Sequence, residues 1–148
     1  MNLDRYELQS GVELEVFEFV SEGPKGRIPK IVQYFPTNYK NLYHLGFGDK
    51  NQVTGEVDDT IVSNNNNSEK VLATVIATLY AFMDKHRHAE VYAAGSTDSR
   101  TRLYRIGISK YLDEALEDFE IFGELDDGWE PFRSDGEYKG FLVSRSEL

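Results

Sequence analysis

The sequence lacks cysteine altogether, and its 148 residues include only three histidines and one tryptophan. Without cysteine, disulfide bonds, thiolate metal ligands and thiol catalysis are excluded, and we assign no metal site. No apolar run approaches the ~20 residues of a membrane-spanning helix. The first residues, Met1 to Arg5, also lack the basic and apolar regions of a signal peptide. We therefore expect a cytoplasmic protein that does not enter a membrane.

The common catalytic and cofactor-binding motifs are absent as well. The sequence contains no Walker P-loop, no dinucleotide-binding glycine fingerprint, no Gly-x-Ser-x-Gly elbow and no His-Glu-x-x-His pair. Catalytic residues and cofactor are therefore unknown at this point, and enzyme activity stays an open question.

Charge is distributed unevenly along the chain, whose formal net charge is −10. Residues 67–111 carry seven basic and four acidic residues, whereas residues 112–148 carry three basic and twelve acidic residues. An acidic total argues against general coating of DNA, because affinity for nucleic acid comes mostly from neutralised phosphates. The basic segment still permits a phosphate-bearing small molecule or a short RNA contact. Alternatively, the acidic C-terminal third packs against the basic helix.

The N-terminal half predicts a run of strands joined by short loops. An apolar content of 40% and an aromatic content of 13% predict one globular domain over residues 1–148. Gly46 and Gly48 are expected to end the fourth strand, and residues 49–56 to form a hairpin connection. The pattern is that of an antiparallel meander, with strands expected at residues 5–9, 13–20, 27–35, 42–47 and 57–63.

Two helices and further strands follow the meander. Residues 67–86 have a wide apolar face, with Asn66 and Glu69 at the spacing of a capping box. After a strand at 89–95, a second helix is expected at 98–114, followed by strands at 118–125 and 138–144. We predict an α+β fold in which two main helices, about 67–86 and 98–114, pack on one mostly antiparallel, curved sheet. The first helix also has a second, flat face of small residues: Ala73, Thr74, Ala77, Thr78 and Ala81.

The stretch from Ala89 to Arg105 predicts a buried strand, a corner and a helix. Val91, Ala93 and Ala94 suit a central strand covered on both faces. The corner carries residues that turn the chain and cap a helix, namely Gly95, Ser96, Thr97 and Asp98. Such a corner points free N–H groups and the positive end of the helix outward, so it is a usable site for a phosphate or carboxylate.

Three arginines follow the corner. At 100° per residue Arg100 falls on the same arc as Tyr104, which is expected to be buried, while Arg102 and Arg105 fall on the opposite side, toward solvent. A guanidinium at the edge of an apolar face needs an acceptor or a route to water. We therefore predict a ligand site formed by Ser96, Thr97, Arg100 and Tyr104, with Arg102 and Arg105 outside it. The alternative is that Arg100 pairs with one of the many carboxylates.

His44 is a further candidate ligand residue. Together with Tyr43, Asp49, Asp58 and Asp59 it can supply polar side chains to a shared cleft. The alternative is a packed or surface histidine in a strand.

Two resemblances bear on function. The order of elements, with Leu103 to Ile108 after the central strand, resembles the acetyl-CoA-dependent N-acetyltransferases. The sequence departs from that family where the helix after residues 57–63 begins, because the Arg/Gln-x-x-Gly-x-Gly/Ala turn that holds the pyrophosphate is missing.

Nearly the whole chain resembles a family of small bacterial proteins of unknown function. The segments that carry this resemblance are Val20 to Gly26, Asn41 to Asp49, Ser68 to Thr74 and Gly95 to Arg105. The second resemblance implies a compact bacterial cytosolic domain, by analogy one half of a toxin–antitoxin or phage-defence pair.

Two hypotheses remain. In the first, the corner binds a phosphate-bearing ligand or RNA. In the second, the acidic surface and the small-residue face of the first helix bind a protein partner or a second copy of the chain.

Overall fold

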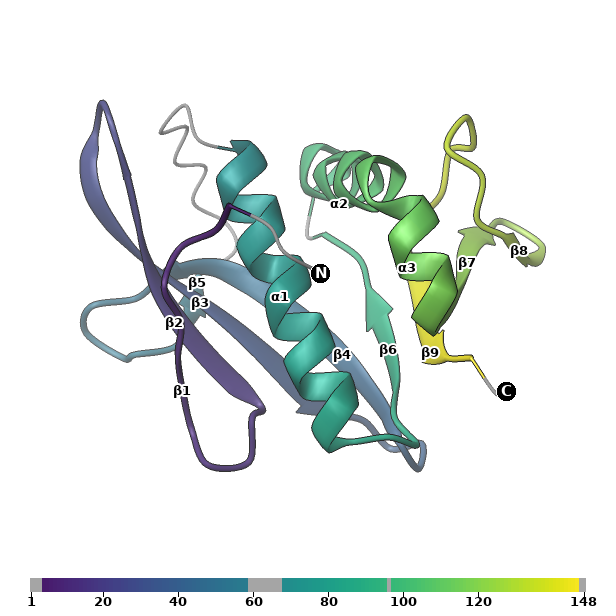
Figure 1. Cartoon of the computed structure of the whole chain (residues 1–148), viewed down its shortest axis with the longest axis horizontal. Coiled ribbons are helices and arrows are strands. Elements are labelled where there is room, and N and C mark those ends of the chain that lie inside the picture. Colours follow the sequence, from purple (N-terminus) through teal and green to yellow (C-terminus); the bar gives the residue numbers. More distant parts are fainter. Residues whose placement is uncertain (1–3, 59–67, 96, 147–148) are drawn as a thin grey trace. The chain divides into compact units, whose positions relative to one another are not determined.

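The computed structural model describes residues 4–58, 68–95 and 97–146, and it shows an α+β chain (Figure 1). These residues form one mostly antiparallel, curved sheet of nine strands together with three helices, which confirms the predicted fold class. The helices are α1 (Ser68–Lys85), α2 (Asp98–Lys110) and α3 (Leu112–Asp118). The strands are β1 (Gln9–Ser10), β2 (Val16–Gly23), β3 (Gly26–Pro36), β4 (Leu42–Lys50), β5 (Val57–Asp58), β6 (Glu90–Ala93), β7 (Phe119–Leu125), β8 (Gly128–Pro131) and β9 (Phe141–Arg145).

The chain divides into two compact units. Unit 1 comprises Met1–Tyr34 and Gly46–Lys85, and unit 2 comprises Phe35–Leu45 and His86–Leu148. Strand β4 therefore contributes its second half to unit 1 and its first half to unit 2. The single-domain organisation stays a prediction.

Unit 1 contains most of the predicted meander and the helix α1. Strands β2 and β3 form a long antiparallel hairpin, and β5 pairs with the end of β4. The ring of Tyr34 on β3 stacks on Phe82 of α1 with centroids 4.2 Å apart, so the apolar face of α1 packs on this sheet as its periodicity predicts. Residues 59–63 of the predicted fifth strand, and the predicted cap at Asn66, lie outside the described residues.

The first strand is shorter than predicted. Only Gln9 and Ser10 pair with β2, although residues 5–9 were expected to form the strand. The backbone N–H of Tyr6 donates instead to the Thr74 hydroxyl of α1, at 2.9 Å. Tyr6 is thus tied to the helix through its backbone, while its hydroxyl binds the backbone of Glu22 on β2.

The predicted break at Gly46 and Gly48 is wrong, because β4 continues to Lys50. Within unit 1, Phe47 and Asp49 are both buried, and Asp49 forms an ion pair with Lys30 of β3. These side-chain contacts outweigh the weak strand preference of glycine. The predicted hairpin after β4 is confirmed, since the N–H of Asn51 donates to the carbonyl of Glu56 at 2.9 Å.

Unit 2 is built around β6. This strand pairs in parallel with β4 and antiparallel with β9, and the order continues through β7 to β8. Val91 and Ala93 are buried whereas Glu90 is exposed and Tyr92 is half-buried. The prediction of a central strand is correct, but only one of its faces is covered.

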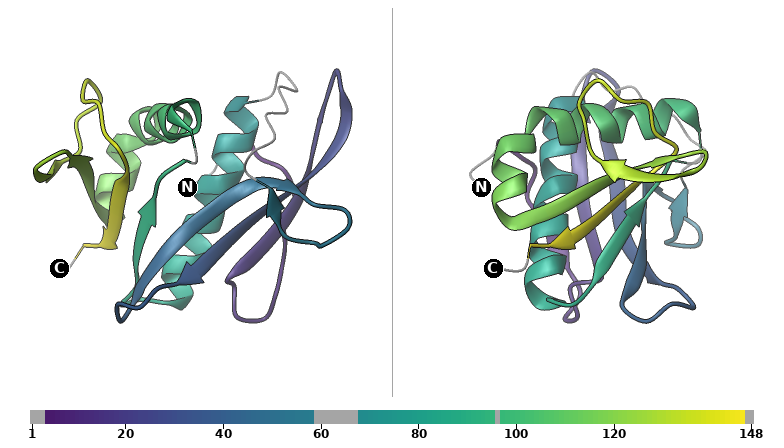
Figure 2. Two further views of the ribbon diagram at one scale, coloured as in Figure 1. Left: turned by 180° about the vertical axis from the view of Figure 1, so that it is seen from behind. Right: turned by 90° about the vertical axis from the view of Figure 1, so that its right-hand side faces the viewer.

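The predicted second helix is divided into α2 and α3. Tyr111 between them has φ −110° and ψ 17°, outside the helical range. Hydrogen bonds from Tyr111 N to Gly107 O and from Ala115 N to Tyr111 O nevertheless continue across the junction. Figure 2 shows that α3 runs in a different direction from α2. No helix in the described part of the chain is both long enough and apolar enough to cross a membrane.

Candidate functional site

The corner between β6 and α2 has the cap that the sequence predicts. Thr97 is extended, and its hydroxyl accepts the N–H of Arg100 at 3.2 Å. The hydroxyl of Thr101, one turn into α2, accepts the N–H of Gly95 at 3.0 Å. These bonds fix the end of the strand against the start of the helix. Ser96 lies outside the described residues.

Gly95 is required by this close approach. A Cβ atom at this position would lie 2.4 Å from Cβ of Arg100 and 2.6 Å from the backbone nitrogen of Thr101. The backbone of α2 cannot move away without loosening its first turn. The glycine therefore serves packing between strand and helix.

A cavity of about 710 Å³ opens beside the corner. It joins the first two turns of α2 to the segment that precedes β9. Its basic side chains outnumber its acidic ones by three to two, and its lining consists of Gly95, Thr97, Asp98, Thr101, Arg102, Arg105, Glu137, Tyr138 and Lys139.

Arg105 was predicted to face solvent, but it forms part of this lining. Its side chain is half-buried, and Nη1 donates to the carbonyl of Gly136 at 3.2 Å. The residues before β9 cover this side of α2, which a helical projection of α2 alone cannot reveal. The prediction for Arg105 is therefore corrected.

Arg102 differs from the other two cations of the cavity. Its side chain is exposed, and it forms no hydrogen bond or ion pair with any residue that the structure describes. Lys139, by contrast, lies 2.6 Å from the carboxylate of Asp126, whose hydrogen bond raises the pKa of the Lys139 ammonium. Arg102 is thus the cation that is available to an incoming anion.

Tyr138 also lines the cavity, and its hydroxyl is bonded to residues outside the lining. Burial and its 2.7 Å hydrogen bond to Glu130 raise the pKa of this phenol. The same oxygen accepts the N–H of Arg133 at 3.1 Å. These bonds hold the ring at the cavity edge with its proton in place.

The remaining predicted ligand residues lie elsewhere. Arg100 is half-buried with its Cβ and Cγ against Gly95, and Tyr104 is buried. Neither residue lines the cavity. The corner thus offers Thr97, Arg102 and Arg105 to a ligand, and the two arginines that the sequence placed outside the site are the ones that face the cavity.

His44 is separate from this cavity. It is exposed on β4, and its ring lies 5.7 Å from that of Tyr92 on β6. Of the carboxylates expected near it, Asp49 is paired with Lys30 in unit 1, and Asp59 lies outside the described residues. The contact with Tyr92 is one that sequence reasoning missed.

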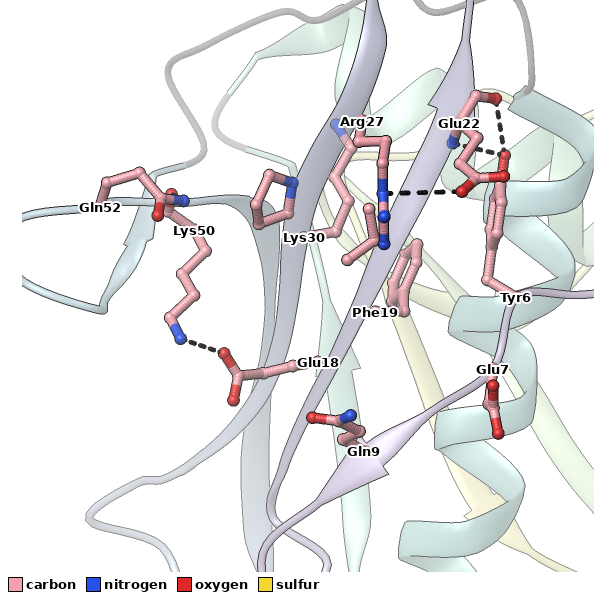
Figure 3. A pocket seen from close by; sticks show the side chains of 12 residues that line it. Tyr6, Glu7, Gln9, Glu18, Phe19, Glu22, Arg27, Lys30, Lys50 and Gln52 are labelled. Carbon is pink, nitrogen blue, oxygen red and sulfur yellow. Dashed lines mark hydrogen bonds and ion pairs between the residues drawn. The ribbon is translucent and has the colours of Figure 1, made fainter.

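A second cavity, of about 650 Å³, lies on the β2–β3 hairpin of unit 1 (Figure 3). Sequence reasoning did not identify it. Its three basic side chains are all in ion pairs, Lys50 with Glu18, Arg27 with Glu22 at 3.6 Å, and Lys30 with Asp49. The hydroxyl of Tyr6 also binds the backbone N–H and carbonyl of Glu22, each at 3.1 Å. Because these groups satisfy each other, this cavity offers less to a charged ligand than the corner does.

Within the described ranges, no group of three or more His, Asp or Glu side chains is arranged to hold a metal ion.

Comparison with known families places the chain in one family. Residues 2–146 match the family described as "Family of unknown function (DUF6934)", and the chain belongs to it. Neither a curated protein nor a solved structure matched the chain.

Proposed function

We propose that this chain binds a small phosphate-bearing ligand in the corner cavity of unit 2. The observation that carries the proposal is Arg102, a cation without a partner among the described residues, in the wall of a cavity at the N-terminus of α2. The first N–H groups of a helix have no acceptor within the helix, and the helix dipole favours an anion there. Arginine matches the geometry of phosphate with two parallel hydrogen bonds.

The ligand is a small molecule in this proposal, and not RNA. Cavities of roughly 300–1,000 Å³ are typical of small-molecule sites, and the corner cavity measures about 710 Å³. A net charge of −10 also works against a long polyanion. These two facts favour a ligand with one or two phosphate groups.

The acidic residues of the cavity narrow the ligand class further. The carboxylates of Asp98 and Glu137 line the same cavity as Arg102. They repel an isolated phosphate dianion, but they accept hydrogen bonds from hydroxyl or amino groups. A phosphorylated sugar or a nucleotide offers both an anion and such donors, so this class fits the lining better than inorganic phosphate does.

Isothermal titration calorimetry with AMP, ribose 5-phosphate and inorganic phosphate tests the proposal. We expect saturable binding of at least one organic phosphate, and about 10- to 100-fold weaker binding to Arg102→Gln, because a hydrogen bond to a charged group contributes roughly 1.5–3 kcal/mol. The matched control is Arg87→Gln, which removes the same charge from an exposed arginine outside the cavity. Absence of binding by all three probes, or an equal loss in both variants, would overturn the proposal.

A further inference from the structure

One face of the strands in unit 2 is not covered by either of the helices described in this unit, α2 and α3. Successive side chains of a strand point to opposite faces, and in β9 and β7 the buried residues alternate with half-buried or exposed ones. The helices α2 and α3 both lie on one side of these strands (Figures 1 and 2). Since a helix covers the side chains beneath it, we assign the buried residues to this side. We call the opposite side of these strands the open face.

A row of aromatic and apolar side chains crosses the open face. Residues that are paired directly in neighbouring strands point to the same side of a sheet. The registers of β4, β6, β9, β7 and β8 therefore align His44, Tyr92, Leu142, Phe122 and Pro131.

Trp129 of β8 lies on the same face, beside this row. It is paired with Glu124 of β7, and its ring meets that of Tyr92 edge to face with centroids 6.1 Å apart. Its side chain is 47% exposed, which is unusual for the largest apolar residue. Exposed aromatic side chains that adjoin one another mark an interaction surface more often than scattered ones do.

The charge of the open face identifies the kind of partner. Paired registers place Glu90, Ser144 and Glu120 in one row, and Glu124 lies beside Trp129. No lysine or arginine occupies a strand position on this face within the described residues. Three carboxylates, of which Glu124 already accepts the Tyr92 hydroxyl, lie near the exposed ring of Trp129 and the half-buried ring of Tyr92. Such a surface suits guanidinium groups, which stack on aromatic faces and bind carboxylates through two hydrogen bonds.

The size of the face favours a polypeptide. Five neighbouring strands span roughly 19 Å at about 4.8 Å per interval. An extended chain of about six residues covers this distance. A nucleic acid would bring phosphates against the three carboxylates, so its charge does not fit.

We propose that the open face is a docking surface for an extended, arginine-bearing segment of a partner protein. Its arginines stack on Trp129 and Tyr92 and pair with Glu90 and Glu120. This surface is distinct from the corner cavity, since the two share no lining residue, and the inference does not depend on the ligand proposed there.

The single tryptophan of the chain provides a direct readout. A short peptide of alternating arginine and glycine is titrated into the full chain while the emission of Trp129 is followed. We expect a saturable change in emission, and no change with a peptide that has glutamine in place of arginine. The double variant Glu90→Gln, Glu120→Gln should bind the arginine peptide about threefold to tenfold more weakly, as expected for the loss of two partly exposed ion pairs.

The matched control is the double variant Glu114→Gln, Glu117→Gln, which makes the same charge change at exposed positions of α3. It should bind the peptide as the wild type does. The proposal is overturned if the arginine peptide leaves the emission unchanged, or if both double variants weaken binding equally. A neutral oligosaccharide or the glutamine peptide that changes the emission as strongly as the arginine peptide would also overturn it.

Discussion

Tyr92 of β6 donates a 2.5 Å hydrogen bond to the carboxylate of Glu124 on β7, although β9 lies between these two strands. Gly140, just before β9, leaves the space that the phenol crosses, because a Cβ there would lie 2.5 Å from the Tyr92 oxygen. A side-chain bond between strands that are not neighbours thus depends on a missing side chain between them.

Replacing Glu124 by glutamine is expected to lower the pKa of Tyr92. Burial is the largest cause of the raised pKa, and the hydrogen bond and charge of Glu124 add to it. The pKa should therefore fall in Glu124→Gln but stay above the usual value of about 10, since burial persists. Titration of tyrosine ¹³Cζ signals by NMR measures it, and an unchanged Tyr92 signal would contradict the assigned contact.

The sign of the linked stability follows from the same shift. The folded-state pKa of Tyr92 lies above its unfolded value, so this contribution to the free energy of unfolding is complete below pH ~10 and is lost as the pH rises through the folded pKa. Chemical denaturation across this alkaline range should show a smaller pH dependence in Tyr92→Phe than in the wild type. An equal dependence in both proteins would rule out the linkage.

Replacing Gly95 by alanine should destabilise unit 2 by about 1–3 kcal/mol. The added methyl group would overlap Cβ of Arg100 and the backbone nitrogen of Thr101, and overpacking of a closed contact has a cost of this size. Gly11→Ala is the matched control, because a Cβ there meets nothing within 4 Å. Urea denaturation compares the two variants, and an equally small effect in both would show that the corner tolerates a side chain.

Sequence patterns predicted the elements whose signals are local. The bounds of α1 came from apolar periodicity over many turns, and the cap at Thr97 came from the preference of its hydroxyl for the first turn of a helix. Residues 136–139 reach the side of α2 through tertiary packing, about thirty residues farther along the chain. The roles of Arg102 and Arg105 depend on that contact, so no pattern within α2 could assign them.

The ion pair between Lys30 and Asp49 is buried, with side-chain exposures of 8% and 12%. Removing one partner takes this ion pair from a charge that stays buried, and such changes destabilise proteins by about 3–5 kcal/mol. Asp49→Asn should therefore lower the free energy of unfolding by an amount in this range. The control is Glu18→Gln, whose pair with Lys50 is 35–40% exposed and should contribute no more than ~1 kcal/mol. Urea denaturation measures the free energy of unfolding of both variants. Similar small decreases in the two variants would show that the Lys30–Asp49 pair is accessible to water.

The hydroxyl groups of Tyr34 and Thr78 join β3 to α1 inside unit 1. Their oxygens lie 2.8 Å apart, and both side chains are fully buried. The Thr78 hydroxyl also donates to the carbonyl of Val75 at 2.6 Å, so Tyr34 is the donor to Thr78. Thr78→Val removes the acceptor and should destabilise the protein by about 1–3 kcal/mol, because a buried donor loses a partner.

A double-mutant cycle separates this bond from the change in packing. Tyr34→Phe removes the donor, so the further loss on adding Thr78→Val should be smaller than the loss from Thr78→Val alone. Denaturant titration of the four proteins gives the coupling energy, which we expect at about 0.5–1.5 kcal/mol. Strictly additive losses would show that the two hydroxyls act independently, and that apolar packing such as the stack of Tyr34 on Phe82 holds α1 on the sheet without help from this bond.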